Sequence, residues 1–174
     1  MSRLSVLAIV VSLLAVGCSK DTPTTPSAPP SKFTFTAALS ALNEVPPVSN
    51  AESTGRGAAT VTMNVTRDAS NNITAATVDV VATFTTFPAG TILTAAHIHT
   101  GNSTTSGGVL VPMVPAAGEV TMPNGSGSFV KGGFPVTPVD VANQIIANPA
   151  GFYFNVHTAL NGGGAARGQL ALQP

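Results

Sequence analysis

Apolar and polar residues alternate along several stretches of this chain, and a period of two is typical of strands that bury one face. The clearest alternating runs are residues 33–40, 59–66 and 76–84. Turn-forming residues separate the second run from the third, which predicts a hairpin. Shorter apolar runs follow at residues 109–114, around Phe129, at 152–158 and at 166–172. About eight short strands with turns between them predict an all-β, antiparallel Greek-key β-sandwich or barrel.

One short helix is expected in this otherwise β-rich chain. Thr137 can cap its N-terminus, and Pro138 suits its first turn. Pro149 would end the helix, after an apolar stripe made by Val141, Ile145 and Ile146.

The first residues are typical of a bacterial export signal. Basic Arg3 precedes an apolar run at residues 4–16 that is short for a membrane span, and the segment ends in Leu-Ala-Val-Gly-Cys at residues 14–18. These last five residues resemble the lipobox, in which the signal is cut before a cysteine that then carries a lipid. The resemblance implies a signal peptide at residues 1–17 and a mature protein anchored to a bacterial membrane through Cys18. An ordinary secretory signal with an incidental cysteine is the alternative.

Residues 18–32 are polar and contain four prolines, a composition that favours an extended, solvated backbone over a packed element. We expect a lipidated tether here that holds the domain off a membrane, facing the periplasm or the extracellular space. Residues 33–174 are enough for one domain with a sizeable core. Cys18 is the only cysteine, so an internal disulfide is excluded and packing must stabilise the domain.

Charged residues make up only 8% of the chain, against about a quarter in average soluble proteins. Seven Lys and Arg balance seven Asp and Glu, so the chain has no basic field that would attract phosphate groups. Nucleic acid is therefore not an expected partner. No Ser-His-Asp arrangement, phosphate-binding glycine loop or Cys-His cluster stands out either, and no catalytic residue is assigned.

The three histidines of the chain fall in two strand-like segments. His97 and His99 flank Ile98, and because successive side chains of a strand point to opposite faces, the two imidazoles share a face. His157, in the second segment, is the only other histidine that could join them. Imidazole nitrogen is a good ligand for copper, zinc and other transition metals. The spacing indicates a metal site at His97, His99 and His157, provided that the two segments are neighbours.

The same alternation assigns faces to the strands around the histidines. The buried face is predicted to hold Ile92, Ala96, Ile98, Phe152, Phe154, Val156, Leu170 and Leu172. The outward face is predicted to hold His97, His99, Tyr153, Asn155, His157, Arg167 and Gln169. Glycine-rich loops at residues 101–108 and 161–164 can fold over the outward face and form a shallow pocket there.

Each of these polar residues also has a structural interpretation. Histidines on a sheet surface often hydrogen-bond to loop carbonyls and bind no metal. Arg167 could guide an anion, but an arginine on a sheet face more often pairs with a carboxylate such as Glu44 or donates to loop carbonyls. We favour the structural role for Arg167. Glu44, beside two prolines, is expected to be an acceptor that fixes its loop rather than a catalytic acid.

Four motifs carry a family resemblance. They are Asn-Glu-Val-Pro-Pro-Val at 43–48, Ala-Ala-His-Ile-His-Thr-Gly at 95–101, Asn-Val-His-Thr at 155–158 and Ala-Arg-Gly-Gln-Leu at 166–170. In this order they resemble the CHRD domain, first described in chordin and common in exported bacterial proteins. The resemblance spans nearly all of residues 33–173. The family commonly has Gly-Glu-aliphatic-Arg-Gly-Gln in its last motif, and here Ala165 replaces the Glu, so any role of that carboxylate is absent or moved.

A more distant resemblance concerns copper chemistry. Copper/zinc superoxide dismutases are Greek-key sandwiches with a His-Val-His copper pair on one strand, a further copper ligand late in the chain, and an arginine that guides the anion. His97 and His99 resemble the pair, His157 the late ligand and Arg167 the arginine. The sequence has no fourth histidine for the bridging ligand, no zinc cluster and no loop disulfide. We expect an immunoglobulin-like or superoxide-dismutase-like arrangement of the strands.

These observations favour a CHRD-domain lipoprotein of the cell envelope that acts as a non-enzymatic binding module. It would bind copper or another transition metal through the three histidines. Its further partner would be a component of the envelope or the extracellular space that the sequence does not identify. The alternative is a copper-dependent redox enzyme of the superoxide dismutase type.

Overall fold

The computed structural model describes residues 28–113 and 118–174. The predicted export signal, Cys18 and most of the predicted tether lie outside these ranges. Within them the chain forms ten strands, one α-helix and two short 3₁₀ helices. The strands are β1 (Lys32–Ser40), β2 (Arg56–Arg67), β3 (Ile73–Thr85), β4 (Thr91–Thr100), β5 (Val109–Met113), β6 (Thr121–Met122), β7 (Gly127–Pro135), β8 (Phe152–Thr158), β9 (Ala166–Gln169) and β10 (Ala171–Leu172). The helices are η1 (Ala41–Asn43), α1 (Asp140–Ala147) and η2 (Pro149–Gly151).

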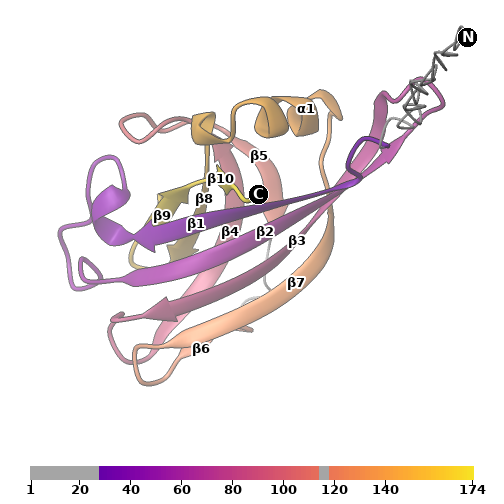
Figure 1. Cartoon of the computed structure of the whole chain (residues 1–174). Coiled ribbons are helices and arrows are strands. Elements are labelled where there is room, and N and C mark those ends of the chain that lie inside the picture. Colours follow the sequence, from indigo (N-terminus) through magenta and orange to yellow (C-terminus); the bar gives the residue numbers. More distant parts are fainter. Residues whose placement is uncertain (1–27, 114–117) are drawn as a thin grey trace, which may run out of the picture.

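The strands pair antiparallel and join into a strongly curved sheet that forms a nearly closed barrel (Figure 1). The main path is β5-β4-β8-β9-β1-β2-β3-β7, with β10 paired to β1 and β6 to β4. The end strands β5 and β7 approach each other, which brings the sheet round on itself. Because β4 pairs with β8 and not with β3, the chain crosses the barrel between consecutive strands, as in a Greek key. The predicted all-β class is confirmed, as a barrel rather than two separate sheets.

Alternate residues of the strands fill the barrel, as the period of two predicts. On β1, β2 and β3 the inward side chains are buried, among them Phe35, Leu39, Val61, Met63, Val78, Val80 and Phe84. Leu93, Ile98 and Phe154 join them from β4 and β8. Full burial of such a side chain contributes about 1.5–3 kcal/mol relative to exposure. Since the chain has a single cysteine, this packing and not an internal disulfide stabilises the barrel.

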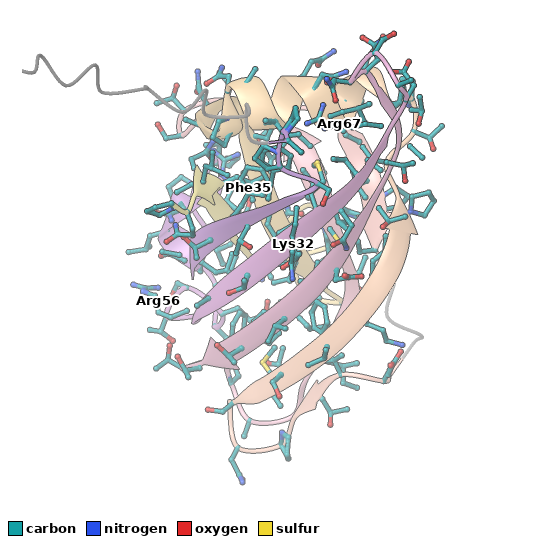
Figure 2. The ribbon with its side chains drawn as sticks, turned by 45° about the vertical axis from the view of Figure 1, so that its right-hand side comes forward. Lys32, Phe35, Arg56 and Arg67 are labelled. Carbon is teal, nitrogen blue, oxygen red and sulfur yellow. The ribbon has the colours of Figure 1, made fainter. Side chains whose placement is uncertain are left out.

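Arginines brace the ends of β2. Arg56 and Arg67 lie at opposite ends of this strand (Figure 2). Arg67 donates to the carbonyl oxygens of Pro30 and Asn71, and Arg56 donates to that of Gly55 at 2.8 Å. Both side chains therefore serve backbone contacts at the ends of the β2–β3 hairpin, whose antiparallel pairing confirms the predicted hairpin.

The face predicted for Ile92 is wrong, and a bulge in β4 is the reason. Ile92 is 43% exposed, whereas its neighbour Leu93 is fully buried. The pairing of β4 with β8 shifts register between Leu93 and Ala95, and an extra residue in one strand reverses the alternation across the bulge. Beyond the bulge Ala96 and Ile98 are buried as predicted. The two histidines of β4 also lie beyond it and keep their predicted face.

The predicted helix is present, but its start and the last strand differ from the prediction. Helix α1 begins at Asp140 after Val139, which makes no side-chain capping bond, so Thr137 is not the cap. The backbone of Val136 still bonds to β3, which keeps the chain extended up to that point. Leu172 is 43% exposed, because it lies on the two-residue strand β10 and lines a surface hollow. The buried stripe of α1 is Val141, Ala142 and Ile145.

Helix α1 lies across one end of the barrel (Figure 1). Among the described residues, no helix has both the length and the apolar character that crossing a bilayer requires.

Candidate metal centre

The face opposite the core on β4, β8 and β9 carries the polar residues that the alternation predicts. Because β8 lies between β4 and β9, residues that are far apart in the sequence become neighbours on this face. The register pairs are His97 with Asn155, Asn155 with Arg167, His99 with Tyr153, Tyr153 with Gln169, and Ala95 with His157.

This face is covered, which corrects the expectation that the histidines lie open on the outside. His99 and His157 are each 7% exposed and His97 is half-buried. Every residue of β8 is buried, whichever face it occupies. The two glycine-rich loops fold over the face as predicted, and residues 41–55 complete the cover. The covering segments bond to one another and to β8 through the pairs Ser106–Val45, Asn50–Asn161 and Glu52–Thr158.

The three imidazole rings converge beneath these loops. His97 Nδ1 lies 2.8 Å from His157 Nε2. The ring centroid of His97 lies 4.7 Å from that of His157 and 5.3 Å from that of His99. One nitrogen of each ring lies within 4.8 Å of a nitrogen of the other two, a spacing that one metal ion can bridge. Residues 28–113 and 118–174 contain no other group of three His, Cys, Asp or Glu side chains with this spacing.

Two loop carbonyls orient two of the rings. Nδ1 of His99 donates to the carbonyl oxygen of Gly107, and Nδ1 of His157 to that of Gly162, both at 3.0 Å. A neutral imidazole carries one N–H, so Nε2 of each ring keeps its lone pair. His97 Nδ1–H is then the donor to His157 Nε2. The candidate ligand atoms are therefore Nε2 of His99 and Nε2 of His157, each with a loop carbonyl behind its ring. His97 can bind a metal through Nδ1 once the proton of that nitrogen has moved to Nε2 and the contact with His157 has opened.

Glycine at position 107 lets its loop approach β4 closely. A Cβ atom there would lie 2.2 Å from the carbonyl oxygen of Thr100, a contact that real side chains do not make. The same residue accepts from His99, and its amide donates to the hydroxyl of Tyr153 at 3.4 Å. The close approach of Gly107 is thus what brings a carbonyl within reach of the imidazole.

The pKa of each histidine is lowered, chiefly because burial disfavours the charged imidazolium. The pKa of His97 falls to about 4, and the charges of His157 and His99 add to the effect of burial. Hydrogen bonds to the loop carbonyls oppose the lowering of the pKa at His99 and His157 without cancelling it. The three rings are therefore neutral near pH 7, which is the form that binds metals.

Arg167 has the structural role that the sequence favours. It is 1% exposed, and its guanidinium lies 4.3 Å from the centre of the Tyr153 ring. That ring stacks on His99 with a centroid distance of 5.0 Å. The guanidinium nitrogens of Arg167 donate to the carbonyl oxygens of Asn43 at 2.7 Å, Thr105 at 3.1 Å and Asn102 at 3.1 Å. Of the two expected kinds of partner, loop carbonyls and Glu44, Arg167 bonds to the carbonyls.

Glu44 lies beside this network and is 7% exposed. The side chain of Asn155 lies beside its carboxylate, whose Oε1 has no hydrogen-bond partner. Burial raises the pKa of Glu44 to about 7, against the opposing effects of the Arg167 charge and the Asn155 hydrogen bond. The side-chain partner of Glu44 thus belongs to β8 and not to its own loop.

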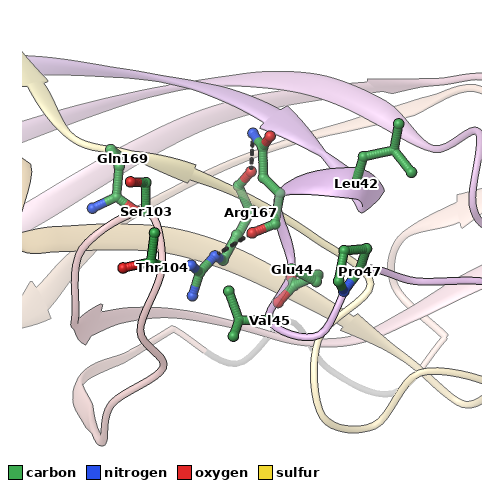
Figure 3. Close-up of a pocket in the computed structure, with 9 residues that line it drawn as sticks. Leu42, Glu44, Val45, Pro47, Ser103, Thr104, Arg167 and Gln169 are labelled. Carbon is green, nitrogen blue, oxygen red and sulfur yellow. Dashed lines mark hydrogen bonds between the residues drawn. The ribbon is translucent and has the colours of Figure 1, made fainter.

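A pocket of about 380 Å³ opens above Glu44 and Arg167. Figure 3 shows Arg167 in the middle of this pocket, with residues of the 101–108 loop on one side and residues of the 42–48 segment on the other. No histidine lines it. A shallow pocket is therefore present, but of the two predicted loops only 101–108 lines it, and it lies over Glu44 and Arg167 and not over the imidazoles.

Two side chains of the site have no predicted role, although the sequence places them on the correct face. Asn155 lies beside Glu44, and Tyr153 stacks on His99. The available signal was their spacing, because both lie at even distances from His157 along one strand. The carbonyls of Gly107 and Gly162 gave no such signal, because a backbone acceptor is the same at every residue.

The sequence matches the family model of the CHRD domain over residues 35–170. The matched segment includes the three histidines and all four motifs described above. No curated protein and no solved structure matches the chain in the corresponding comparisons. By the extent of the family match, this chain belongs to the CHRD domain family.

Proposed function

We propose that this protein is a metal-binding CHRD lipoprotein of the bacterial cell envelope, which holds copper or a similar transition metal and does not catalyse a reaction. The observation that carries the proposal is the convergence of His97, His99 and His157, whose ring nitrogens lie within 4.8 Å of one another.

The donor set supports a transition metal. Neutral imidazole is a suitable ligand for copper, zinc, iron and nickel ions. Two of the rings are already oriented by the carbonyls of Gly107 and Gly162, so binding costs little further ordering. Among the divalent ions of the first transition-metal row, affinity for a given set of nitrogen ligands is highest for copper. Copper is therefore the ion that we propose.

A cluster of hydrogen-bonded histidines without a metal is the competing interpretation. The contact between His97 Nδ1 and His157 Nε2 fits that interpretation, and it equally fits a metal site to which no ion is yet bound. Metal content separates the two, because a hydrogen-bonded cluster retains no metal through dialysis.

The test uses the mature chain, purified with a tag that lacks histidine, since the chain itself has only three histidines. The protein is loaded with copper and dialysed, and its copper content is measured by mass spectrometry. We expect stoichiometric copper in the wild type and its loss in His97→Ala and in His157→Ala. Lys131→Ala, on β7 away from the site, is the control and should keep its copper. A copper-free wild type, or histidine variants that load normally, would contradict the proposal.

Anchoring is a separate part of the proposal. The lipobox-like residues 14–18 and the proline-rich tether support attachment through Cys18. In a bacterial host fed labelled palmitate, we expect the wild type to carry the label in the membrane fraction. Cys18→Ala should be unlabelled and should leave that fraction. An unlabelled wild type would contradict the anchor and leave the metal site untouched.

The arrangement around Arg167 favours binding over dismutase-type turnover. Arg167, which resembles an anion-guiding arginine, is 1% exposed and donates to three loop carbonyls, so it is not free to steer superoxide. Superoxide decay in the presence of copper-loaded protein tests the alternative. Turnover that disappears in His157→Ala would make the protein a redox enzyme, and bound copper without turnover would support the binding module.

A further inference from the structure

Three buried acceptor atoms beside the histidine cluster have no hydrogen-bond partner. They are Glu44 Oε1, Asn155 Oδ1 and His99 Nε2. The side chains of Glu44 and His99 are each 7% exposed, and that of Asn155 is 1% exposed. Buried polar atoms in native proteins are nearly always paired, so three unpaired acceptors in neighbouring residues need a physical explanation.

Asn155 connects the other two residues. It lies on β8 opposite His97, and its side chain lies beside both the Glu44 carboxylate and the His99 ring. The carboxylate is an acceptor, so the amide NH₂ of Asn155 faces Glu44 and the amide oxygen faces the histidines. His99 donates through Nδ1 to Gly107, which leaves the lone pair of its Nε2 toward the cluster. Lone pairs of Asn155 and His99 therefore face the same space, and a cation between them would relieve their repulsion.

The charges around the cluster also indicate a role for Glu44. Neutral imidazole ligands supply no charge that could balance a cation, and Arg167 already brings one positive charge under the loops. A cation bound there needs a negative charge nearby. Glu52, the other buried carboxylate of this region, is already bonded to Thr158 and Asn161. Glu44, with an unpartnered oxygen, is the carboxylate available for that role.

We propose that Asn155 and Glu44 form the outer wall of the metal site: Asn155 directs its amide oxygen toward the cation, and Glu44 orients that amide and balances the charge of the cation. Both are positioning residues in this scheme. The inference rests on the metal-binding function proposed above, and it adds a preference of the site for divalent over monovalent ions. Because a Coulomb interaction scales with charge, Glu44 favours a divalent ion more than a monovalent one.

The decisive comparison is Glu44→Gln against the wild type, with Cu²⁺ and Cu⁺ as the two probes. Gln keeps the shape of the side chain and removes its charge. The affinities are measured at pH 8 by competition with chelators of known affinity for each oxidation state. We expect the affinity for Cu²⁺ to fall about tenfold or more, within the range usual for residues behind metal ligands. The affinity for Cu⁺ should fall only about threefold, because half the charge gives half the Coulomb free energy.

Asp79→Asn is the matched control. Asp79 is a half-buried carboxylate that accepts from Asn64 at 2.8 Å, the same kind of pair as Glu44 with Asn155, but on β3 and β2. Its substitution removes one negative charge from the protein and should leave both copper affinities unchanged.

Asn155→Leu tests the amide oxygen. We expect weaker binding of both ions and an altered electron paramagnetic resonance spectrum of the Cu²⁺ that remains bound. Circular dichroism checks that the variant is folded, and if it is not, Glu44→Gln carries the test alone because its shape is conserved.

The outcomes separate the two proposals. Equal losses of Cu²⁺ and Cu⁺ affinity in Glu44→Gln would indicate loosened packing and would overturn the role of its charge. Unchanged affinities, as in Asp79→Asn, would overturn the outer wall while leaving the three-histidine site in place. A wild type that binds neither ion would overturn the proposed function itself.

Discussion

Single buried polar side chains hold the candidate site together, and Arg167 is the clearest case. It is 1% exposed, yet each of its donor nitrogens meets a backbone carbonyl, and its guanidinium lies over the ring of Tyr153. A buried charge is tolerated only when it is bonded in this way. Arg167 thereby joins residues 102–105 to residue 43, two segments that cover the histidines.

Replacing Arg167 by Lys should therefore be costly although it conserves the charge. An ammonium on a flexible chain cannot reach three separate carbonyls or stack on Tyr153 in the manner of a planar guanidinium. We expect Arg167→Lys to lower the free energy of unfolding by about 2–4 kcal/mol, measured by urea denaturation. Arg56→Lys is the control, since Arg56 is half-buried at a strand end and should lose less than about 1 kcal/mol. Equal losses in the two variants would refute the role given to Arg167.

At the scale of elements, the 101–108 loop determines whether the imidazoles on the strands below it are exposed or enclosed. β4 and β8 alone would present imidazoles to solvent, and the loop converts that surface into an enclosed site. The loop contacts the two aromatic rings below it through its backbone: the Gly107 carbonyl accepts from His99, and the Gly107 amide donates to Tyr153. Its position therefore depends on how closely its backbone can approach β4.

Two neighbouring glycines provide a matched test of that approach. A Cβ at Gly107 would lie 2.2 Å from the Thr100 carbonyl oxygen, whereas one at Gly108 would meet nothing within 4 Å. Gly107→Ala should displace the loop, lower the free energy of unfolding by about 1–3 kcal/mol, and weaken copper binding. Gly108→Ala should leave both the urea midpoint and the copper affinity close to the wild-type values. A Gly107→Ala protein that binds copper normally would show that the carbonyl does not orient His99.

At the scale of the whole molecule, the buried titratable groups act on stability in opposite directions. The histidines have pKa values below their ordinary value of 6.5, reaching about 4 at His97, so the unfolded chain binds more protons in that interval. Stability therefore rises with pH through this interval. The pKa of Glu44 is raised from 4.5 to about 7, so the folded chain binds more protons there and stability falls as pH rises.

The Glu44→Gln variant separates these contributions. Removal of the carboxyl group leaves the histidines, so the variant should gain stability relative to the wild type as pH rises from about 4.5 to 8. The gain should reach at most about 3 kcal/mol, from the size of the pKa change at Glu44. Urea unfolding of metal-free protein across this pH range measures it. A difference between the two proteins that does not vary with pH would mean that Glu44 does not titrate in this range.

Copper should also stabilise the whole barrel, because a ligand that binds only the folded state shifts the unfolding equilibrium. At a free concentration of 100 times the dissociation constant, the gain is about 2.7 kcal/mol. Thermal unfolding with and without copper should show an increase in Tm in the wild type and none in His97→Ala. An equal increase in both proteins would place the bound copper elsewhere.

Local patterns in the sequence determined much of the fold. The period of two on β1, β2 and β3, the hairpin between β2 and β3, and the shared face of His97 and His99 were all predictable, because side-chain direction in a strand depends only on neighbouring residues. The exceptions are also local in cause. Ile92 was misplaced by a bulge, and the helix begins after Thr137 because the preceding chain stays paired to β3.

The tertiary structure alone decided that His157 meets the β4 histidines, since that depends on β8 pairing with β4 and not with β7, the strand that precedes β8 in the chain. It also decided that the polar face is enclosed and that Asn155 lies between Glu44 and His99. These contacts join residues about 50 to 110 positions apart through loop backbone and cross-strand register. Residue type and spacing specify which atoms can bond, but only the packed chain brings the carbonyls and carboxylates to them, because a long-range contact is set by the closure of the whole barrel.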